Sequence, residues 1–181
     1  MTICFQRWHN MKKIVFIAGI HGVGKTTFCK KIQEDVAIKH YSCSSLIKAN
    51  SEYIETSKAI DKAERNQLVL IEALNQISDK KLLLDGHFCL IDKSNSVLRL
   101  KDSVFESLNL SAVVVLTCDV KTIHSRLKER DGATFDIELL QQLQDAELEM
   151  AIRISSKLNI QLIHYHSGEP LKKITAFIST L

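Results

Sequence analysis

The chain has 181 residues, of which 45% are apolar and 25% are charged, and its formal net charge is +3 at pH 7. This composition is that of an average soluble globular protein, and it excludes a disordered or fibrous chain. Because the lysines and arginines are scattered, neither a nucleic-acid surface nor a membrane-binding surface is indicated.

The cysteines follow neither a disulfide framework nor a metal-site spacing. Their number is odd, and no CxxC pair or Cys/His metal pattern occurs among them. The first ten residues lack the apolar stretch of a secretory signal, and no apolar run is long enough to span a bilayer. These features predict a cytoplasmic protein with reduced thiols. The cysteines are Cys4, Cys29, Cys43, Cys89 and Cys118.

Short apolar runs alternate with longer amphipathic stretches, which is the pattern of repeated βαβ units around a parallel sheet. Because the runs are apolar throughout, helices should cover both faces of the sheet. We predict an N-terminal extension at 1–11 and one α/β domain at 12–181. The five predicted core strands are residues 14–18, 38–42, 81–84, 112–117 and 160–165.

Directly after the first strand, residues 19–26 (GIHGVGKT) satisfy the phosphate-binding pattern G-x-x-x-x-G-K-[ST]. Glycines leave no side chain between the backbone amides and a phosphate, and the following helix adds the positive end of its dipole. Lys25 would bind the β- and γ-phosphates, and the Thr26 hydroxyl would ligate Mg²⁺. His21 is either a spacer or a substrate contact. The predicted nucleotide-binding residues are Gly19, His21, Gly22, Val23, Gly24, Lys25, Thr26 and Thr27.

The region between the second and third strands contains apolar residues at three- and four-residue intervals from 60 to 77, which predicts a helix. The third strand then ends in Leu84-Asp85-Gly86-His87. A P-loop site needs a carboxylate beside its metal, and Asp85 is the best candidate. The alternative is that Asp85-Gly86 forms the tight turn of a hairpin.

The fourth strand leads through Asp119, a natural N-cap, into a helix that carries Arg126 and Arg130. These two arginines lie four residues apart, where like charges repel, and a bound polyphosphate would remove the repulsion. The alternative is a pair of solvated cations near the helix C-terminus. The following segment, near 131–135, is either a short lid with a glycine hinge or an ordinary interhelical turn.

A long helix is predicted from 137 to 158 by its apolar spacing. Arg153 on this helix has Glu149 one turn earlier, so the two are candidates for a surface ion pair of little energetic weight. After the fifth strand, Pro170 is expected in the first turn of a closing helix.

From Lys12 onward the arrangement resembles the nucleoside monophosphate kinases, and most of all the archaeal type of adenylate kinase. Residues 17–27 (IAGIHGVGKTT) match the family's T-G-x-x-G-V-G-K-T-T loop, and residues 84–87 (LDGH) match its acidic strand end followed by His. Residues 125–130 (SRLKER) match its S-R-x-K-R helix, and Arg153 matches an arginine of the helix after the lid. The resemblance implies a three-layer P-loop NTPase fold with a five-stranded parallel sheet in the order 2-3-1-4-5.

The resemblance also implies transfer of the γ-phosphoryl group of ATP to a nucleoside monophosphate, with Mg²⁺ as cofactor and catalysis by positioning and charge neutralisation. The groups implied to neutralise the migrating phosphoryl group are Lys25, Arg126, Arg130 and Arg153. Thr26 and Asp85 would hold Mg²⁺, with Asp85 acting through water. The acceptor would lie over residues 42–47 and the helix that follows. The candidate acceptor-binding residues are Ser44, Ser45, Arg65, Gln67, His87 and Arg99.

Two departures from the family leave the acceptor open. The lid is short and lacks several arginines, and residues 94–102 (SNSVLRLKD) replace a proline- and glycine-rich stretch. One alternative is an ATP-hydrolysing or nucleotide-gated module that regulates a protein partner, because a thin lid excludes water less well. Another is a kinase for a non-nucleotide small molecule such as a sugar acid.

Overall fold

The computed structural model describes residues 12–51, 62–132 and 135–181. At its centre is a five-stranded parallel sheet in the order β2-β3-β1-β6-β7. A separate antiparallel hairpin is formed by β4 (Cys89–Ile91) and β5 (Val97–Arg99). Without the hairpin strands the order is 2-3-1-4-5, so the predicted fold class is confirmed. The sheet strands are β1 (Lys13–Ala18), β2 (Lys39–Ser42), β3 (Lys81–Gly86), β6 (Leu110–Thr117) and β7 (Gln161–His166).

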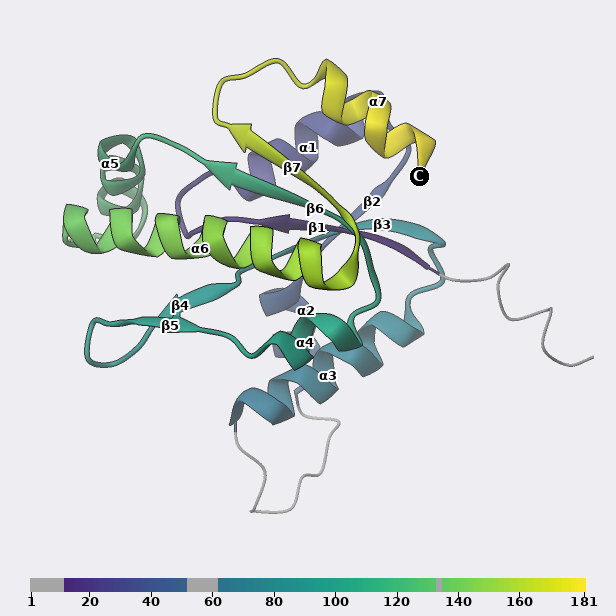
Figure 1. The fold of residues 1–181 in the computed structure, drawn as a ribbon, viewed down its shortest axis with the longest axis horizontal. Coiled ribbons are helices and arrows are strands. Elements are labelled where there is room, and N and C mark those ends of the chain that lie inside the picture. The colour runs from purple at the N-terminus through teal and green to yellow at the C-terminus, as the bar shows by residue number, and fades with distance from the viewer. Residues whose placement is uncertain (1–11, 52–61, 133–134) are drawn as a thin grey trace, which may run out of the picture.

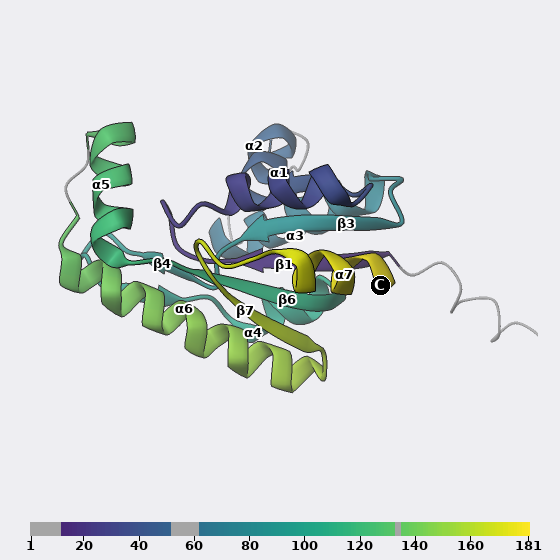
Figure 2. The same cartoon turned by 90° about the horizontal axis from the view of Figure 1, so that it is seen from above.

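Helices cover both faces of this sheet: α1 lies on one face and α6 on the opposite face (Figure 2). The carboxyl ends of β1 and β6 point toward the end of the molecule where α5 stands (Figure 1). The loops that follow these parallel strands therefore gather at one edge of the sheet. The helices of the described residues are α1 (Lys25–Asp35), α2 (Cys43–Asn50), α3 (Lys62–Gln76), α4 (Asp102–Ser107), α5 (Val120–Asp131), α6 (Ile137–Leu158) and α7 (Lys172–Thr180).

The core explains why the strand sequences are apolar without alternation. Val15, Leu83 and Val114 on the three central strands are fully buried, because helices cover each side of the sheet. Phe16 packs edge-on against Phe88 and Phe105, with ring centroids 5.1 and 5.8 Å apart. This aromatic cluster fixes the chain directly after β3, where the predicted site residue His87 stands.

One alternative reading and one local expectation are wrong. Asp85-Gly86 is not a hairpin turn, because Gly86 pairs with Ala18 inside the parallel sheet. The hairpin turn comes later, where the Asp92 carboxylate accepts from the amides of Ser94 and Ser96 at 2.8 and 2.9 Å. Pro170 is not in the first turn of the closing helix. The chain turns into α7 through Leu171, whose carbonyl accepts from the amide of Ile174, so the first helical residue is Lys172.

The other predictions from the sequence concern membrane spans, the cysteines, the N-terminal extension and the lid. Among the described residues no helix is long and apolar enough to cross a bilayer. Cys29, Cys89 and Cys118 are buried free thiols and Cys43 is a partly buried one, as expected. Cys4 and the extension at 1–11 lie outside the described residues. In the predicted lid, Gly132 ends α5 with a φ of 65°, while residues 133–134 lie outside the described residues.

Candidate functional site

The loop between β1 and α1 has a backbone that requires glycine. A Cβ on Gly19 would lie 2.9 Å from the Leu116 carbonyl oxygen and 2.9 Å from Val23 Cγ1, so a larger residue would force the loop away from β6. Gly24 is the N-cap of α1 and has a φ of 105°, a conformation that strains residues with a side chain. The geometry thus matches the glycine spacing on which the phosphate-binding prediction depends.

In the described structure the N-terminus of α1, like those of α2, α4 and α7, has no side-chain cap, whereas α5 and α6 each have one. Asp119 caps α5 by accepting from the amide of Thr122 at 2.9 Å, and Asp136 caps α6 by accepting from the amide of Glu138 at 2.7 Å. No described side chain caps α1, and Thr26 and Thr27 are exposed on its first turn. Its first amides therefore remain able to bind an anion from outside.

Lys25 is buried beneath this loop. Its ammonium group donates to the carbonyl of Gly19 at 2.5 Å and to the carbonyl of Ile20 at 3.2 Å, and it lies 3.0 Å from His87 Nε2. Burial lowers the pKa of Lys25 to about 8, while the negative charges of Glu147 and Asp85 oppose that shift. The Lys25 ammonium group is therefore a desolvated cation held by the carbonyls of the loop.

His87 and His21 lie together beside Lys25, with ring centroids 4.2 Å apart. Burial and the neighbouring positive charges of Lys25 and His21 lower the pKa of His87 to about 2. His87 is therefore neutral at physiological pH, and its Nε2 accepts a hydrogen bond from the Lys25 ammonium group. The structure brings two predicted residues, one from the P-loop and one from the acceptor set, into contact.

Asp85 stands at the carboxyl end of β3, 7% exposed, and its Oδ2 lies 2.5 Å from His40 Nε2 on β2. Among the described residues there is no group of three or more side chains that would hold a metal by themselves. Mg²⁺ commonly binds one or two protein groups together with phosphate oxygens and water. Thr26, an exposed residue of α1, and Asp85 supply the hydroxyl and carboxylate oxygens that this mode of binding uses.

Of the four predicted cationic partners, Lys25 lies beneath the P-loop, and the three arginines lie on α5 and α6. Arg126 on α5 reaches the P-loop, where it donates to the carbonyls of Gly22 and Val23 at 3.3 Å each, and Arg130 follows one turn later on the same helix. Arg153 instead forms an ion pair with Asp102 on α4.

The alternative pairing of Arg153 with Glu149 is wrong, because Glu149 on α6 binds Arg99 on β5 at 2.8 Å. Both members of that pair are exposed. Neither Arg99 nor Arg153 has a hydrogen bond to the P-loop in the described part of the chain.

Among the described residues, the predicted acceptor residues Ser44, Ser45, Arg65 and Gln67 do not share a common partner, unlike the residues around Lys25. Ser44 and Ser45 are exposed on the first turn of α2, and Ser44 Oγ lies 3.0 Å from Ser42 Oγ. The Arg65 guanidinium donates to the carbonyl of Ser51 at 2.8 Å. Gln67 donates to the carbonyl of Ser103 and the hydroxyl of Ser107, so it ties α3 to the region of α4.

Sequence reasoning missed two residues at this site, His40 and Glu147, and also Gln144, which lies beside the site and binds the backbone of Cys118. The Glu147 carboxylate is 1% exposed and accepts from the amides of Gly19, Phe88 and Cys89 at 2.7–3.0 Å. Burial raises its pKa to about 7, against the opposing effect of those amides and of Lys25. A signal did exist, because Gln144 and Glu147 share the apolar face of the predicted helix with Leu143 and Met150.

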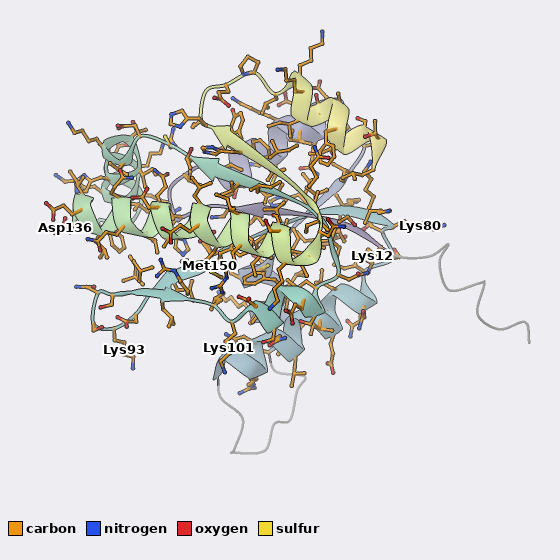
Figure 3. The ribbon with its side chains drawn as sticks, in the orientation of Figure 1. Lys12, Lys80, Lys93, Lys101, Asp136 and Met150 are labelled. Atoms are coloured by element: carbon orange, nitrogen blue, oxygen red, sulfur yellow. The ribbon has the colours of Figure 1, made fainter. Side chains whose placement is uncertain are left out.

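A cleft of about 480 Å³ is lined by residues at the other end of the sheet, including Lys12 and Lys80. These lysines and Asp136, at the start of α6, mark opposite ends of the molecule (Figure 3). The cleft adjoins the amino ends of the strands, whereas the P-loop follows the carboxyl end of β1. It is therefore separate from the candidate site.

Comparisons with known proteins agree with this geometry. A sequence model of the AAA domain family matches residues 18–144. A protein of Methanocaldococcus jannaschii described as "Putative adenylate kinase" is 27% identical over 118 residues, which make up 64% of this chain and 58% of that relative. The match thus spans little more than half of the relative's length.

Several solved structures share the fold. A gluconokinase from Sinorhizobium meliloti 1021 is 20% identical with a TM-score of 0.51, over 94% of this chain and 91% of that one. The tunicamycin resistance protein of Deinococcus radiodurans is 17% identical with a TM-score of 0.59, over 93% and 94%. A sugar kinase from Janibacter sp. HTCC2649 is 16% identical with a TM-score of 0.52, over 93% of each chain. At these identities the likeness is one of fold alone.

Proposed function

Since this chain belongs to the AAA domain family and has the fold of P-loop kinases, we propose that it is an ATP-dependent phosphotransferase that moves the γ-phosphoryl group of ATP to a small acceptor. A nucleoside monophosphate is the first candidate acceptor. The observation that supports the proposal most strongly is the uncapped N-terminus of α1 with buried Lys25 beneath it. Such an end binds a chain of phosphates, and the lysine neutralises their charge.

On the donor side, backbone amides of residues 20–26 would surround the phosphates of ATP, while the Gly19 amide stays bound to Glu147. A phosphate oxygen that binds the Lys25 ammonium group would replace its carbonyl and imidazole partners, and the negative charge would raise the pKa of Lys25 again. Lys25 would therefore be fully charged when phosphate is bound. Arg126, which already contacts the P-loop, would approach the transferring group from α5, with Arg130 one turn behind.

Magnesium held by Thr26, and by Asp85 through water, would supply further charge neutralisation. In the reaction the bond between the γ-phosphorus and the β–γ bridging oxygen breaks, and a bond to an acceptor oxygen forms. A monophosphate acceptor offers an oxygen that is already ionised. Binding and orientation by the protein then account for most of the catalysis.

A non-nucleotide acceptor, such as a sugar acid, is favoured by one observation. Two arginines predicted to bind an acceptor phosphate hold other partners: Arg65 binds the Ser51 carbonyl and Arg99 binds Glu149. An acceptor that needs fewer cationic contacts suits this arrangement. The gluconokinase and the sugar kinase among the structural neighbours are named for acceptors of this kind.

The test is a reaction panel. The protein is incubated with Mg-ATP and, in separate reactions, AMP, CMP, UMP, GMP and gluconate, and both ADP and the phosphorylated acceptor are quantified. Transfer to one acceptor supports the proposal and identifies the acceptor class. ADP without a phosphorylated acceptor would instead support the hydrolysing or regulatory alternative. A protein that neither binds Mg-ATP nor forms ADP would refute both.

The cytoplasmic location remains a prediction from the sequence.

A further inference from the structure

Helix α6 sends two polar side chains onto the loops at the carboxyl ends of three strands. Gln144 accepts from the amide of Cys118 and donates to its carbonyl, both at 3.0 Å, directly after β6. One turn later Glu147 accepts from Gly19, directly after β1, and from Phe88 and Cys89, which follow β3. The same helix face thus contacts both the P-loop and the segment behind it.

Packing alone does not call for a carboxylate at position 147. The neighbouring positions on this face, Leu143 and Met150, are apolar and buried. A buried carboxylate costs several kcal/mol in desolvation unless hydrogen bonds replace the lost water. Here three backbone amides converge on its two oxygens, and each oxygen accepts. A glutamine cannot reproduce this, because one end of its amide donates.

The contacts of Glu147 lead to Lys25 by two routes. Glu147 binds the amide of Gly19, and the carbonyl of Gly19 accepts from Lys25 at 2.5 Å. It also binds the amide of Phe88, and the preceding residue, His87, lies 3.0 Å from Lys25 Nζ. The titratable groups that face the carboxylate are Lys25 from α1 and the Cys89 thiol from β4.

We infer that Glu147 is a positioning residue, which holds the entrance of the P-loop and the segment after β3 in the arrangement that presents Lys25 to a phosphate. Gln144 holds the neighbouring loop but reaches neither Gly19 nor His87 in the described structure. The positioning role of Glu147 rests on its hydrogen bonds to Gly19, Phe88 and Cys89. Its effect on nucleotide binding rests also on the proposed function.

The first experiment reads the amides directly in ¹⁵N-labelled wild-type protein, Glu147→Gln and Gln144→Ala. In the wild type, the amide protons of Gly19, Phe88 and Cys89 should shift together with pH, with one midpoint near 7. In Glu147→Gln this shared titration should disappear and hydrogen exchange at the three amides should accelerate about tenfold or more, while Cys118 is unchanged. In Gln144→Ala, hydrogen exchange at the Cys118 amide should accelerate, while the shared titration of Gly19, Phe88 and Cys89 is retained. Amides that titrate and exchange in Glu147→Gln as in the wild type would overturn the inference.

The second experiment measures Mg-ATP affinity by calorimetry at pH 8, with thermal stability measured alongside. Glu147→Gln should weaken binding about tenfold, and Gln144→Ala less than about twofold even where the two variants lose similar stability. Equal losses of affinity that track the losses of stability would overturn the inference, because they would indicate a structural role alone.

A third variant covers the case in which Glu147→Gln does not fold. Glu147→Asp keeps the charge but is one methylene shorter, so it should bind fewer of the three amides and show an intermediate affinity. Wild-type affinity in this variant would count against the inference. If the wild type does not bind Mg-ATP, the proposed function fails, while the amide titration still decides whether Glu147 positions the loop.

Discussion

The proposed donor side and the proposed acceptor side of the site are built in different ways. On the donor side, Lys25 is buried, and its partners come from the P-loop and from the segment after β3. On the acceptor side, Ser44 and Ser45 are exposed, and Arg65 holds a backbone carbonyl of its own region. Under the proposed function, this difference means that the fold pre-organises phosphate binding, whereas the acceptor supplies contacts of its own to order its side of the site.

Loss of the buried cation should break the donor side with the largest effect. Lys25→Ala is expected to lower the rate of phosphoryl transfer by about 10³-fold, because the charge that neutralises the migrating group is removed. The matched control is Lys30→Ala, an exposed lysine of the same helix, which should retain wild-type activity. Steady-state kinetics with the acceptor found in the panel measures both. A Lys25→Ala enzyme with normal turnover would refute the donor-side assignment.

Arg126 tests whether the donor side extends to α5. Arg126→Ala should reduce kcat about 100-fold with a smaller change in the KM for ATP, because the arginine contacts the loop where charge develops during transfer. Lys128→Ala, two residues along the same helix and exposed, is the control. Equal effects of both substitutions would show that α5 contributes only a general positive field.

The buried carboxylate should give the donor side a characteristic dependence of stability on pH. Burial raises the pKa of Glu147 from 4.5 to about 7, so the folded protein binds more protons than the unfolded chain between these values. The stability contribution is fully present below pH 4.5 and is lost as pH rises through about 7. Full loss corresponds to about 3 kcal/mol at about 1.36 kcal/mol per pKa unit.

Chemical denaturation of the wild type and Glu147→Gln across pH 5–8 measures this effect. His87 acts in the opposite sense, because its pKa is lowered from 6.5 to about 2, and its contribution is lost as pH falls through that range. Because both proteins contain His87, subtracting one stability curve from the other removes the contribution of His87 and leaves that of Glu147. Parallel stability curves would contradict the raised pKa of Glu147.

The smallest effect is expected at Arg153. Its guanidinium pairs with Asp102 and is 55% exposed, so Arg153→Ala should change kcat/KM by less than about threefold. Arg99→Ala, which breaks the exposed pair with Glu149, is the comparison variant. A loss of about 100-fold at Arg153 alone would support the catalytic role that the family resemblance implies, and would require the ion pair with Asp102 to open during the reaction.

Much of the fold and of the donor side could be predicted from local patterns. The unbroken apolar run of β1, the glycine spacing of residues 19–26 and the N-cap Asp119 each act over a few residues, so their outcome is readable in the chain. The β4–β5 hairpin was missed because its turn residues follow Asp92 rather than the stronger signal at Asp85-Gly86. The ion pair of Arg153 could not be predicted, since its partner Asp102 comes from α4, a helix that the pattern did not predict.

The sequence by itself determined that a parallel α/β sheet carries a phosphate-binding loop, because backbone propensity, apolar spacing and the glycines of that loop all act locally. Only the tertiary structure decided that Lys25 meets His87, that Asp85 meets His40 and that Glu147 binds three amides from two strand ends. These contacts join residues 45 to 128 positions apart. They arise because parallel strands bring their carboxyl ends to one edge of the sheet, which no local pattern records.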